Sequence, residues 1–430
     1  MLKKRYFILL SLLMICTSVF TGAFCLFTVY KAFSLQATTG TWAEDPSLLT
    51  AFAVYSADDN SLSFYKQRTI PAVDEIYNGK SVTAVYPDIE NMDISSEKDV
   101  PWYQDYATEI KKVAAIDIIR PKNISCWFLY MRNCTDFDLK NIDTSQVTSM
   151  KNTFYRAGAY APSLILDLTS WDTSNVTTME GMFYYAGSSR NTKTFQLDLS
   201  TWDVSNVTSF YQMFDSAGEY ASLWTLGDLK TKVITKEDGS TYHAWDVSNV
   251  EDFTAMFSCV AEGADDFTLD ISNWNISSAL YLGRMFSAFR RDKKGAVIEM
   301  DFSTKAVQLE DGTTYTAWDL SNYTGHLYYM FGYAGNNAKT FKIDLSSWDI
   351  SNVNSLKWMF YGTGSNASDF SLGDLSKWDT GNVTDMESLF RDAGKSADWS
   401  LDLSGWDVSK VTSRGYFAMG VTDKITLPSF

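Results

Sequence analysis

The sequence of 430 residues is poor in the side chains that most enzymes and metal sites use. It contains two histidines, His243 and His326, and only five cysteines. Two histidines leave little room for histidine-based metal sites or proton relays, and five cysteines are too few for a disulfide scaffold. The sequence also lacks a glycine-rich phosphate loop, a nucleophile elbow and a paired-histidine zinc motif. We therefore expect a protein that is not an enzyme and that needs no cofactor.

Basic residues are in the minority, with 36 Lys and Arg against 52 Asp and Glu, which gives a net charge of −16. This acidity disfavours binding to phosphate backbones, so we expect no nucleic acid partner. Hydrophobic residues make up 45% of the chain and charged residues 20%, which is enough for a large core and argues against disorder.

The longest apolar run lies near the N-terminus. Lys3, Lys4 and Arg5 precede the uncharged residues 6–30, a stretch long enough to cross a hydrocarbon core of roughly 30 Å. We predict that residues 1–37 form a signal-anchor helix that contacts the membrane, or a signal peptide that is cleaved. The basic residues on the amino side would leave the rest of the chain outside the cytoplasm, at the cell surface or secreted.

Three cysteines would then lie in an oxidising setting, and the sequence leaves their state open; they are Cys126, Cys134 and Cys259.

An internal repeat dominates the rest of the chain. Tryptophan followed by Asp or Asn recurs at eight positions, and a degenerate ninth copy starts at Ile142. The eight are Trp171, Trp202, Trp245, Trp274, Trp318, Trp348, Trp378 and Trp406. Most are followed twelve residues later by a phenylalanine, as Trp171 is by Phe183. Regular self-similarity of this kind is typical of stacked repeat architectures.

One copy illustrates the fold that we expect. Residues 195–199 alternate apolar and polar side chains, which indicates a half-buried strand. Val207, Phe210, Met213 and Phe214 follow at helical spacing, which indicates a short helical turn. No single copy can bury its own apolar face, so the copies must stack. We predict an α/β, leucine-rich-repeat-like solenoid of short parallel strands and short helical turns, with an N-terminal β-rich cap.

The domain prediction follows from the range of the repeat. We assign residues 38–141 to the cap region, 142–420 to a solenoid of about nine repeats, and 421–430 to a C-terminal strand or tail.

Two copies carry insertions, near residues 230–244 and 303–317. Each contains an Asp-Gly pair between β-forming residues, which is a hairpin signal. Insertions in repeat proteins often line the binding edge, although they are also tolerated as neutral decoration. The candidate binding surface consists of Glu237, Asp238, Tyr242, Glu310, Asp311 and Tyr315.

Two aspartate columns need a physical account, one in the strand and one directly after tryptophan. Like charges stacked about 5 Å apart repel unless they are hydrogen-bonded, screened or bridged by cations. Calcium is the candidate cation, and its candidate ligands are Asp198, Asp203, Asp344 and Asp349. We favour the alternative, in which the second column caps the following turn and the first faces water. An asparagine column that includes Asn206 is expected to hydrogen-bond neighbouring turns.

The tract at residues 171–183, Trp-Asp-Thr-Ser-Asn-Val-Thr-Thr-Met-Glu-Gly-Met-Phe, resembles the repeats of the BspA-like leucine-rich-repeat surface proteins of bacteria. The resemblance implies secreted or surface-attached proteins, several of them associated with adhesion to host matrix or to other cells, and no catalytic activity. The present chain has a longer repeat than that family.

We therefore predict a non-enzymatic extracytoplasmic surface protein that uses a rigid repeat solenoid for adhesion or for protein or ligand binding. Its partner would be a host or neighbouring-cell surface protein, the matrix or a glycan. Recognition would lie in the hairpins or in the sheet face, which includes Gln196, Asp198, Asp270, Lys342 and Asp344. The alternatives are a self-associating structural envelope protein and a carbohydrate-binding module with exposed rings such as Trp224 and Trp399.

Overall fold

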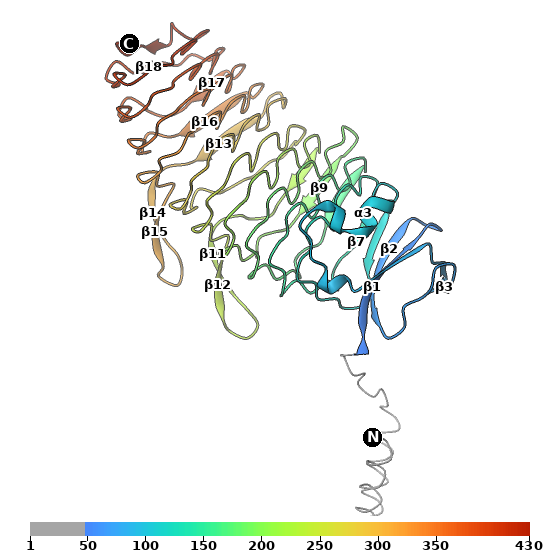
Figure 1. The fold of residues 1–430 in the computed structure, drawn as a ribbon. Coiled ribbons are helices and arrows are strands. Elements are labelled where there is room, and N and C mark those ends of the chain that lie inside the picture. The colour runs from blue at the N-terminus through green and yellow to red at the C-terminus, as the bar shows by residue number, and fades with distance from the viewer. Residues whose placement is uncertain (1–47) are drawn as a thin grey trace, which may run out of the picture. The chain divides into compact units, whose positions relative to one another are not determined.

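The computed structural model describes residues 48–430, of which Thr50–Phe430 form one compact unit. Strands and turns recur with the period of the tryptophan column, and each copy lies beside the next copy along the chain (Figure 1). We call the strand segments of successive copies the strand side. We call the segments around the recurring phenylalanines, such as residues 150–158 and 253–261, the turn side.

The first part of the unit is a five-stranded sheet with the order β5-β1-β2-β6-β7. Strand β1 pairs antiparallel with β2 and β5, whereas β2–β6 and β6–β7 are parallel, so the sheet passes from a hairpin into the parallel pairing of the repeats. Its strands are β1 (Thr50–Ser56), β2 (Ser61–Gln67), β5 (Ala84–Pro87), β6 (Lys112–Ala115) and β7 (Asp136–Asp138).

Short elements complete this first part. They are β3 (Ile76–Tyr77), β4 (Lys80–Ser81), the 3-10 helices η2 (Ile89–Asn91) and η3 (Glu97–Asp99), and helix α3 (Pro101–Tyr106). Helix α3 starts with proline at its first position, where the missing N–H costs no hydrogen bond. It buries Trp102, whose indole N–H donates to the carbonyl of Trp127 at 2.7 Å.

The strand side of the repeats consists of small, separate parallel sheets. One has the order β10-β9-β8, another β13-β16-β17, and β18 pairs with β19 near the C-terminus. The strands are β8 (Ser163–Leu166), β9 (Thr194–Leu197), β10 (Leu223–Thr225), β13 (Val297–Asp301), β16 (Thr340–Asp344), β17 (Asp369–Ser371), β18 (Leu401–Asp402) and β19 (Ile425–Thr426). The register aligns equivalent buried residues, as Phe195 lies opposite both Leu164 and Trp224.

The turn side, as far as the structure describes it, is a run of turns without a helix. Every second backbone N–H donates to the carbonyl three residues earlier in the chain, as that of Thr153 does to Met150. The N–H groups between them donate to carbonyls of the next copy, as that of Phe154 does to Met182 at 2.8 Å. An α-helix would instead bond each N–H four residues back with φ near −63° throughout. Here φ turns positive at every fourth residue, as at Asn152 (55°) and Arg156 (57°).

The predicted α/β, leucine-rich-repeat-like solenoid is therefore wrong. Residues 142–420 hold no α-helix in the described structure, and the strands fall into several small sheets. The apolar spacing that we interpreted as helical arises because a turn repeated every four residues also returns side chains to one side.

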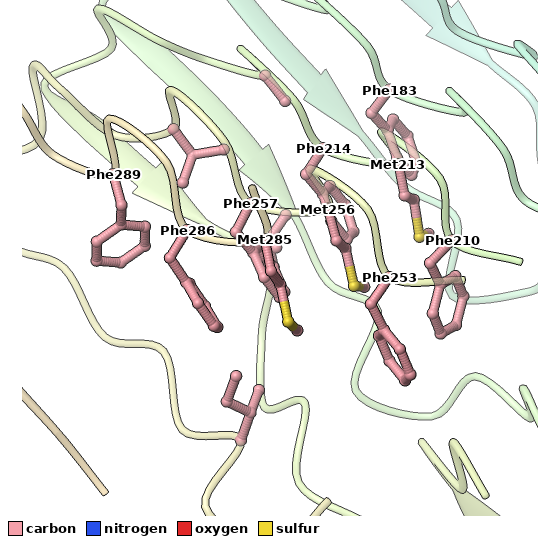
Figure 2. Close-up of a cluster of buried hydrophobic side chains, with 14 of the residues drawn as sticks. Phe183, Phe210, Met213, Phe214, Phe253, Met256, Phe257, Met285, Phe286 and Phe289 are labelled. Carbon is pink, nitrogen blue, oxygen red and sulfur yellow. The ribbon is translucent and has the colours of Figure 1, made fainter. Parts of the chain in front are cut away.

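The core is built from ladders of identical side chains. Eight phenylalanine rings from Phe154 to Phe390 stack at centroid separations of 5.5–5.9 Å with interplanar angles of at most 16°. Figure 2 shows four of them in a row, with a methionine column beside them. Buried tryptophans form a second ladder. From Trp245 onward each indole N–H of this ladder donates to a carbonyl of the preceding copy, as Trp245 does to Leu199 at 2.8 Å, whereas that of Trp171 has no partner in the described structure. These bonds satisfy buried polar groups that would otherwise destabilise the core.

In residues 48–430, no helix is long and apolar enough to cross a membrane. The predicted signal anchor within residues 1–37 lies outside the described residues. Among the described residues the structure provides no anchoring helix, and we correct the predicted signal-anchor element of the fold and the predicted membrane-anchored localisation accordingly. Cys126, Cys134 and Cys259 are free thiols, and burial raises the pKa of Cys126 to about 12.

Candidate binding surfaces

The two insertions form antiparallel hairpins that project from neighbouring parts of the repeat unit (Figure 1). The first pairs β11 (Lys232–Thr235) with β12 (Thr241–Ala244), and the second pairs β14 (Lys305–Gln308) with β15 (Thr314–Ala317). The glycines of the two Asp-Gly pairs have φ of 84° and 88°, the left-handed conformation that these turns require.

The two predicted tyrosines hold the hairpins against the repeat. The phenolic O–H of Tyr242 donates to the carbonyl of Thr201, and that of Tyr315 donates to the carbonyl of Asn273 at 2.7 Å, each in the preceding copy. Both rings are half-buried, and burial raises the pKa of both phenols. Their contacts orient the hairpins, so they are less available to a ligand than the sequence suggested.

The hairpins also contact each other. Asp311, at the turn of the second hairpin, lies 2.7 Å from Nε2 of His243 in β12. Its carboxylate also accepts the N–H of Thr313, and these two contacts lower the pKa of Asp311 to about 2. Sequence reasoning missed this pair because the two residues are 68 positions apart. The remaining predicted residues, Glu237, Asp238 and Glu310, are exposed.

The aspartate columns accept hydrogen bonds from their own turns. In both columns the carboxylate accepts the N–H two residues on, as Asp344 does from Ser346 and Asp349 from Ser351. Asp198 and Asp203 make the same contacts with the serines that follow them. In the part of the chain that the structure describes, no three His, Cys, Asp or Glu side chains gather where they could hold a metal ion.

The predicted sheet face is tied together by ion pairs. Lys342 contacts Asp369 at 2.5 Å, and Lys230 contacts Asp270 at 2.6 Å. The predicted asparagine ladder is confirmed at five positions, where each side-chain amide donates to a serine carbonyl of the preceding copy. They are Asn175, Asn206, Asn249, Asn352 and Asn382.

A second surface, on the turn side, was not predicted. We call it the C-terminal aromatic group: Tyr328, Tyr329, Tyr333, Trp358, Tyr361 and Tyr416. Trp358 lies 5.6 Å from Tyr328 and 6.0 Å from Tyr329 between ring centroids, and Tyr333 lies 4.8 Å from Tyr361. All six rings are half-buried or exposed, and Tyr416 is 63% exposed.

Arginines cover parts of this group. The guanidinium of Arg391 lies 5.2 Å from the Tyr361 ring and 5.3 Å from the Tyr416 ring, and Arg284 lies 5.6 Å from Tyr329. Such cation–π contacts are favourable at a surface and fix the arginine side chains.

The signal that could have revealed this group is the identity of residues flanking the ladder phenylalanines. Within two residues after the ring, two later copies carry Tyr333 and Tyr361, and the first copies also carry tyrosines there. The middle copies instead carry Asp215 and Ser216, Ser258 and Cys259, or Ser287 and Ala288. Trp224 and Trp399, which we had expected to be exposed, prove otherwise: Trp224 is 2% exposed and Trp399 is half-buried.

The recurring copies, and the ladders that join each copy to the next, define a repeat protein. A family model described as "Mycoplasma protein of unknown function, DUF285" matches residues 122–237, 238–308 and 296–423, and the chain belongs to this family. No curated protein and no solved structure matches the chain.

Proposed function

We propose that this chain is a non-catalytic repeat protein that binds a protein partner through the C-terminal aromatic group. The observation that carries the proposal is the gathering of five tyrosines and one tryptophan, with Arg391 and Arg284, on adjacent copies. Tyrosine, tryptophan and arginine are the side chains enriched at the energetically dominant positions of protein interfaces.

The backbone beneath these rings is already in place for binding. The backbone N–H of Tyr329 donates to the carbonyl of Lys357 at 3.1 Å, and that of Trp358 donates to the carbonyl of Glu387 at 2.9 Å. The backbone of each aromatic residue is therefore hydrogen-bonded to the next copy. Rings held in this way lose little conformational entropy when a partner binds. Positive φ at Tyr329 (54°) and Trp358 (58°) belongs to the turn pattern of every copy and is not a local distortion.

Three further points support a binding role. The tryptophan tract resembles the repeats of BspA-like proteins, and this resemblance implies relatives associated with adhesion. The exposed hairpin residues Glu237, Asp238 and Glu310 offer an acidic second contact. The net charge of −16 favours a protein surface with basic groups over a polyanion.

The test is a binding screen of the full chain against immobilised matrix proteins and glycans, with and without calcium. The double variant Trp358→Ser/Tyr361→Ser should weaken a saturable protein interaction by about 2 kcal/mol or more, because it removes two central rings. Tyr281→Ser is the matched control, since Tyr281 is 57% exposed and lies outside the aromatic group.

Equal binding by the double variant and the wild-type chain would exclude this surface. Binding to glycans alone would instead indicate carbohydrate recognition by the same rings. Removal of both hairpins in a separate variant tests the acidic contact independently.

A further inference from the structure

The strand side is interrupted in the middle of the repeat unit. Residues 266–271 occupy the strand position between β10 and β13, yet their backbone pairs with β10 only at the single bridge Leu223–Asp266. No pairing joins them to β13 in the described chain, and β13 is the outermost strand of its sheet, with β16 on the other side. One edge of β13 therefore has no strand beside it.

A glycine column accompanies four of the pairings on the strand side. A Cβ atom at Gly218 would lie 2.5 Å from Phe195 and 2.7 Å from Trp224, and one at Gly335 would lie 2.6 Å from Phe341 and 2.9 Å from Ile298. Each glycine thus fits between the side chains of two adjacent strands. The four parallel pairings among β8, β9, β10, β13, β16 and β17 each have such a glycine: Gly187, Gly218, Gly335 and Gly364.

The interrupted join has a different residue in this column. Ala261 stands between the strand positions of Trp224 and Phe267, and Arg290 stands between those of Phe267 and Ile298. The guanidinium of Arg290 lies 4.8 Å from the Phe267 ring, and Phe289 packs edge-on to the same ring at 5.2 Å. The extra bulk keeps the two strand segments apart. A glycine at this position permits strand pairing but does not ensure it. Gly158 and Gly394 occupy the same column, yet β7 and β8, and likewise β17 and β18, belong to different sheets.

The separation leaves a pocket of about 400 Å³ between the two segments. This volume falls within the usual range of ligand sites, about 300–1,000 Å³. Its walls are residues 267–272, Phe289 and the open edge of β13, Val297–Asp301. Apolar side chains form part of the lining, and three carboxylates surround it: Asp270, Glu299 and Asp301.

The charges around the pocket are unevenly compensated. Asp270 pairs with Lys230 at 2.6 Å and Asp301 pairs with Lys305 at 2.5 Å. Glu299 is exposed and lies opposite Lys342 of β16, which itself pairs with Asp369, and it has no ion pair within 4.0 Å among the described residues. The pocket therefore retains a negative charge that complements a basic ligand.

We propose that this pocket binds an extended, lysine- or arginine-containing segment of a partner protein as an additional strand along β13. The free edge of β13 supplies backbone hydrogen bonds, the apolar lining accepts alternate side chains, and Glu299 with its neighbouring carboxylates pairs with the basic residues between them. This is the strand-addition mode of peptide recognition. The inference does not depend on the C-terminal aromatic group.

The experiment measures fluorescence anisotropy of a labelled synthetic peptide of about eight residues in which valine alternates with lysine. Replacing Arg290 by glycine should let the segments close and weaken binding by about tenfold or more, whereas Arg190→Gly, at an exposed arginine elsewhere, should leave it unchanged. Glu299→Lys, at an exposed position, should weaken binding by about fivefold without affecting folding. Trp358→Ser should have no effect, which separates this site from the proposed aromatic surface.

Two further peptides and one polyamine complete the test. A peptide with glutamate in place of lysine should bind at least about tenfold more weakly, and so should one that is N-methylated at alternate residues, because it cannot pair with β13. Spermine should compete poorly. Unchanged binding of the N-methylated peptide, full competition by spermine, or unaltered binding by the folded Arg290→Gly and Glu299→Lys variants would each overturn the proposal.

Discussion

The turn side and the strand side of the same copies differ in continuity. Across the interrupted region the phenylalanine ladder continues without a break, with Phe257 at 5.8 Å from Phe286 and Phe286 at 5.5 Å from Phe331. On the strand side of these copies, the pairing stops between residues 266–271 and β13. Every second N–H of the turns donates to a carbonyl of the next copy whatever the side chain, whereas four of the strand pairings have a glycine between the facing side chains. The turn side can thus maintain the register while the strand side varies.

The largest expected effect comes from removing one ring on each side of a single copy. Phe257 is fully buried in the ladder, and Phe267 is half-buried beside the pocket. Phe257→Ala should lower the free energy of unfolding by about 4 kcal/mol, because it removes a ring and leaves a cavity that its neighbours cannot fill. Phe267→Ala should cost about half as much, and urea denaturation of both variants measures the difference. Equal losses would show that the two sides contribute equally to stability.

A second, smaller effect concerns a buried carboxyl group in the same copies. The Glu262 side chain is 1% exposed, its nearest charged partner is Arg291 at 3.3 Å, and neither carboxylate oxygen has a hydrogen bond in the described structure. Burial raises the pKa of Glu262 from 4.5 to about 8, with Arg291 opposing the shift and Glu219 adding to it.

The sign of the pH dependence follows from this shift. Above about pH 4.5 the unfolded chain releases a proton that the folded chain retains until about pH 8, so stability falls as the pH rises through this window. Glu262→Gln should remove that component and stabilise the protein by about 3 kcal/mol at about pH 8.5, with little gain at about pH 4. Urea midpoints of both proteins across this range test the prediction. A parallel pH profile for wild type and variant would contradict it.

The residues that the sequence identified correctly are those whose role repeats in most copies. The tryptophan column, the ladder phenylalanines and the Asn206 column are buried or bonded as their period requires. The helix prediction failed because 3.6-residue spacing and a turn every four residues are nearly the same over one copy, and φ is invisible in the side-chain pattern.

The candidate site was harder to predict for a different reason. The contact between His243 and Asp311 and the pocket beside β13 depend on which copies become neighbours and on single departures from the repeat. The sequence alone shows that Arg290 replaces glycine in this column. That the replacement separates two strand segments can be inferred only once the structure shows that side chains of two strands lie against this position. Departures from a repeat thus carry information only after the repeat has been placed in three dimensions.

A third prediction tests the glycine column directly. Gly218→Ala should cost about 2 kcal/mol or more, because the new Cβ would lie 2.5 Å from Phe195 and because φ at this position is 56°. Gly239→Ala is the matched control: its φ is 84°, but nothing lies within 4 Å of a Cβ there, so it reports backbone strain alone, at about 1 kcal/mol. Thermal unfolding of the two variants separates steric closeness from strain. Equal costs would mean that β9–β10 pairing does not depend on the small residue.

The smallest effect concerns the asparagine column, which joins successive copies at their surface. The Asn206 amide donates to the carbonyl of Ser174 at 2.7 Å, whereas Asn322, at the equivalent position of a later copy, makes no such bond in the described structure. Asn206→Ala should therefore cost about 1 kcal/mol and Asn322→Ala close to nothing, because only the first change removes an intercopy hydrogen bond. Hydrogen exchange at residues 174–178 should speed up only in the Asn206 variant. If both variants lose the same stability, the asparagine column contributes through turn propensity. Successive copies would then be joined by the backbone hydrogen bonds and the ring ladders alone.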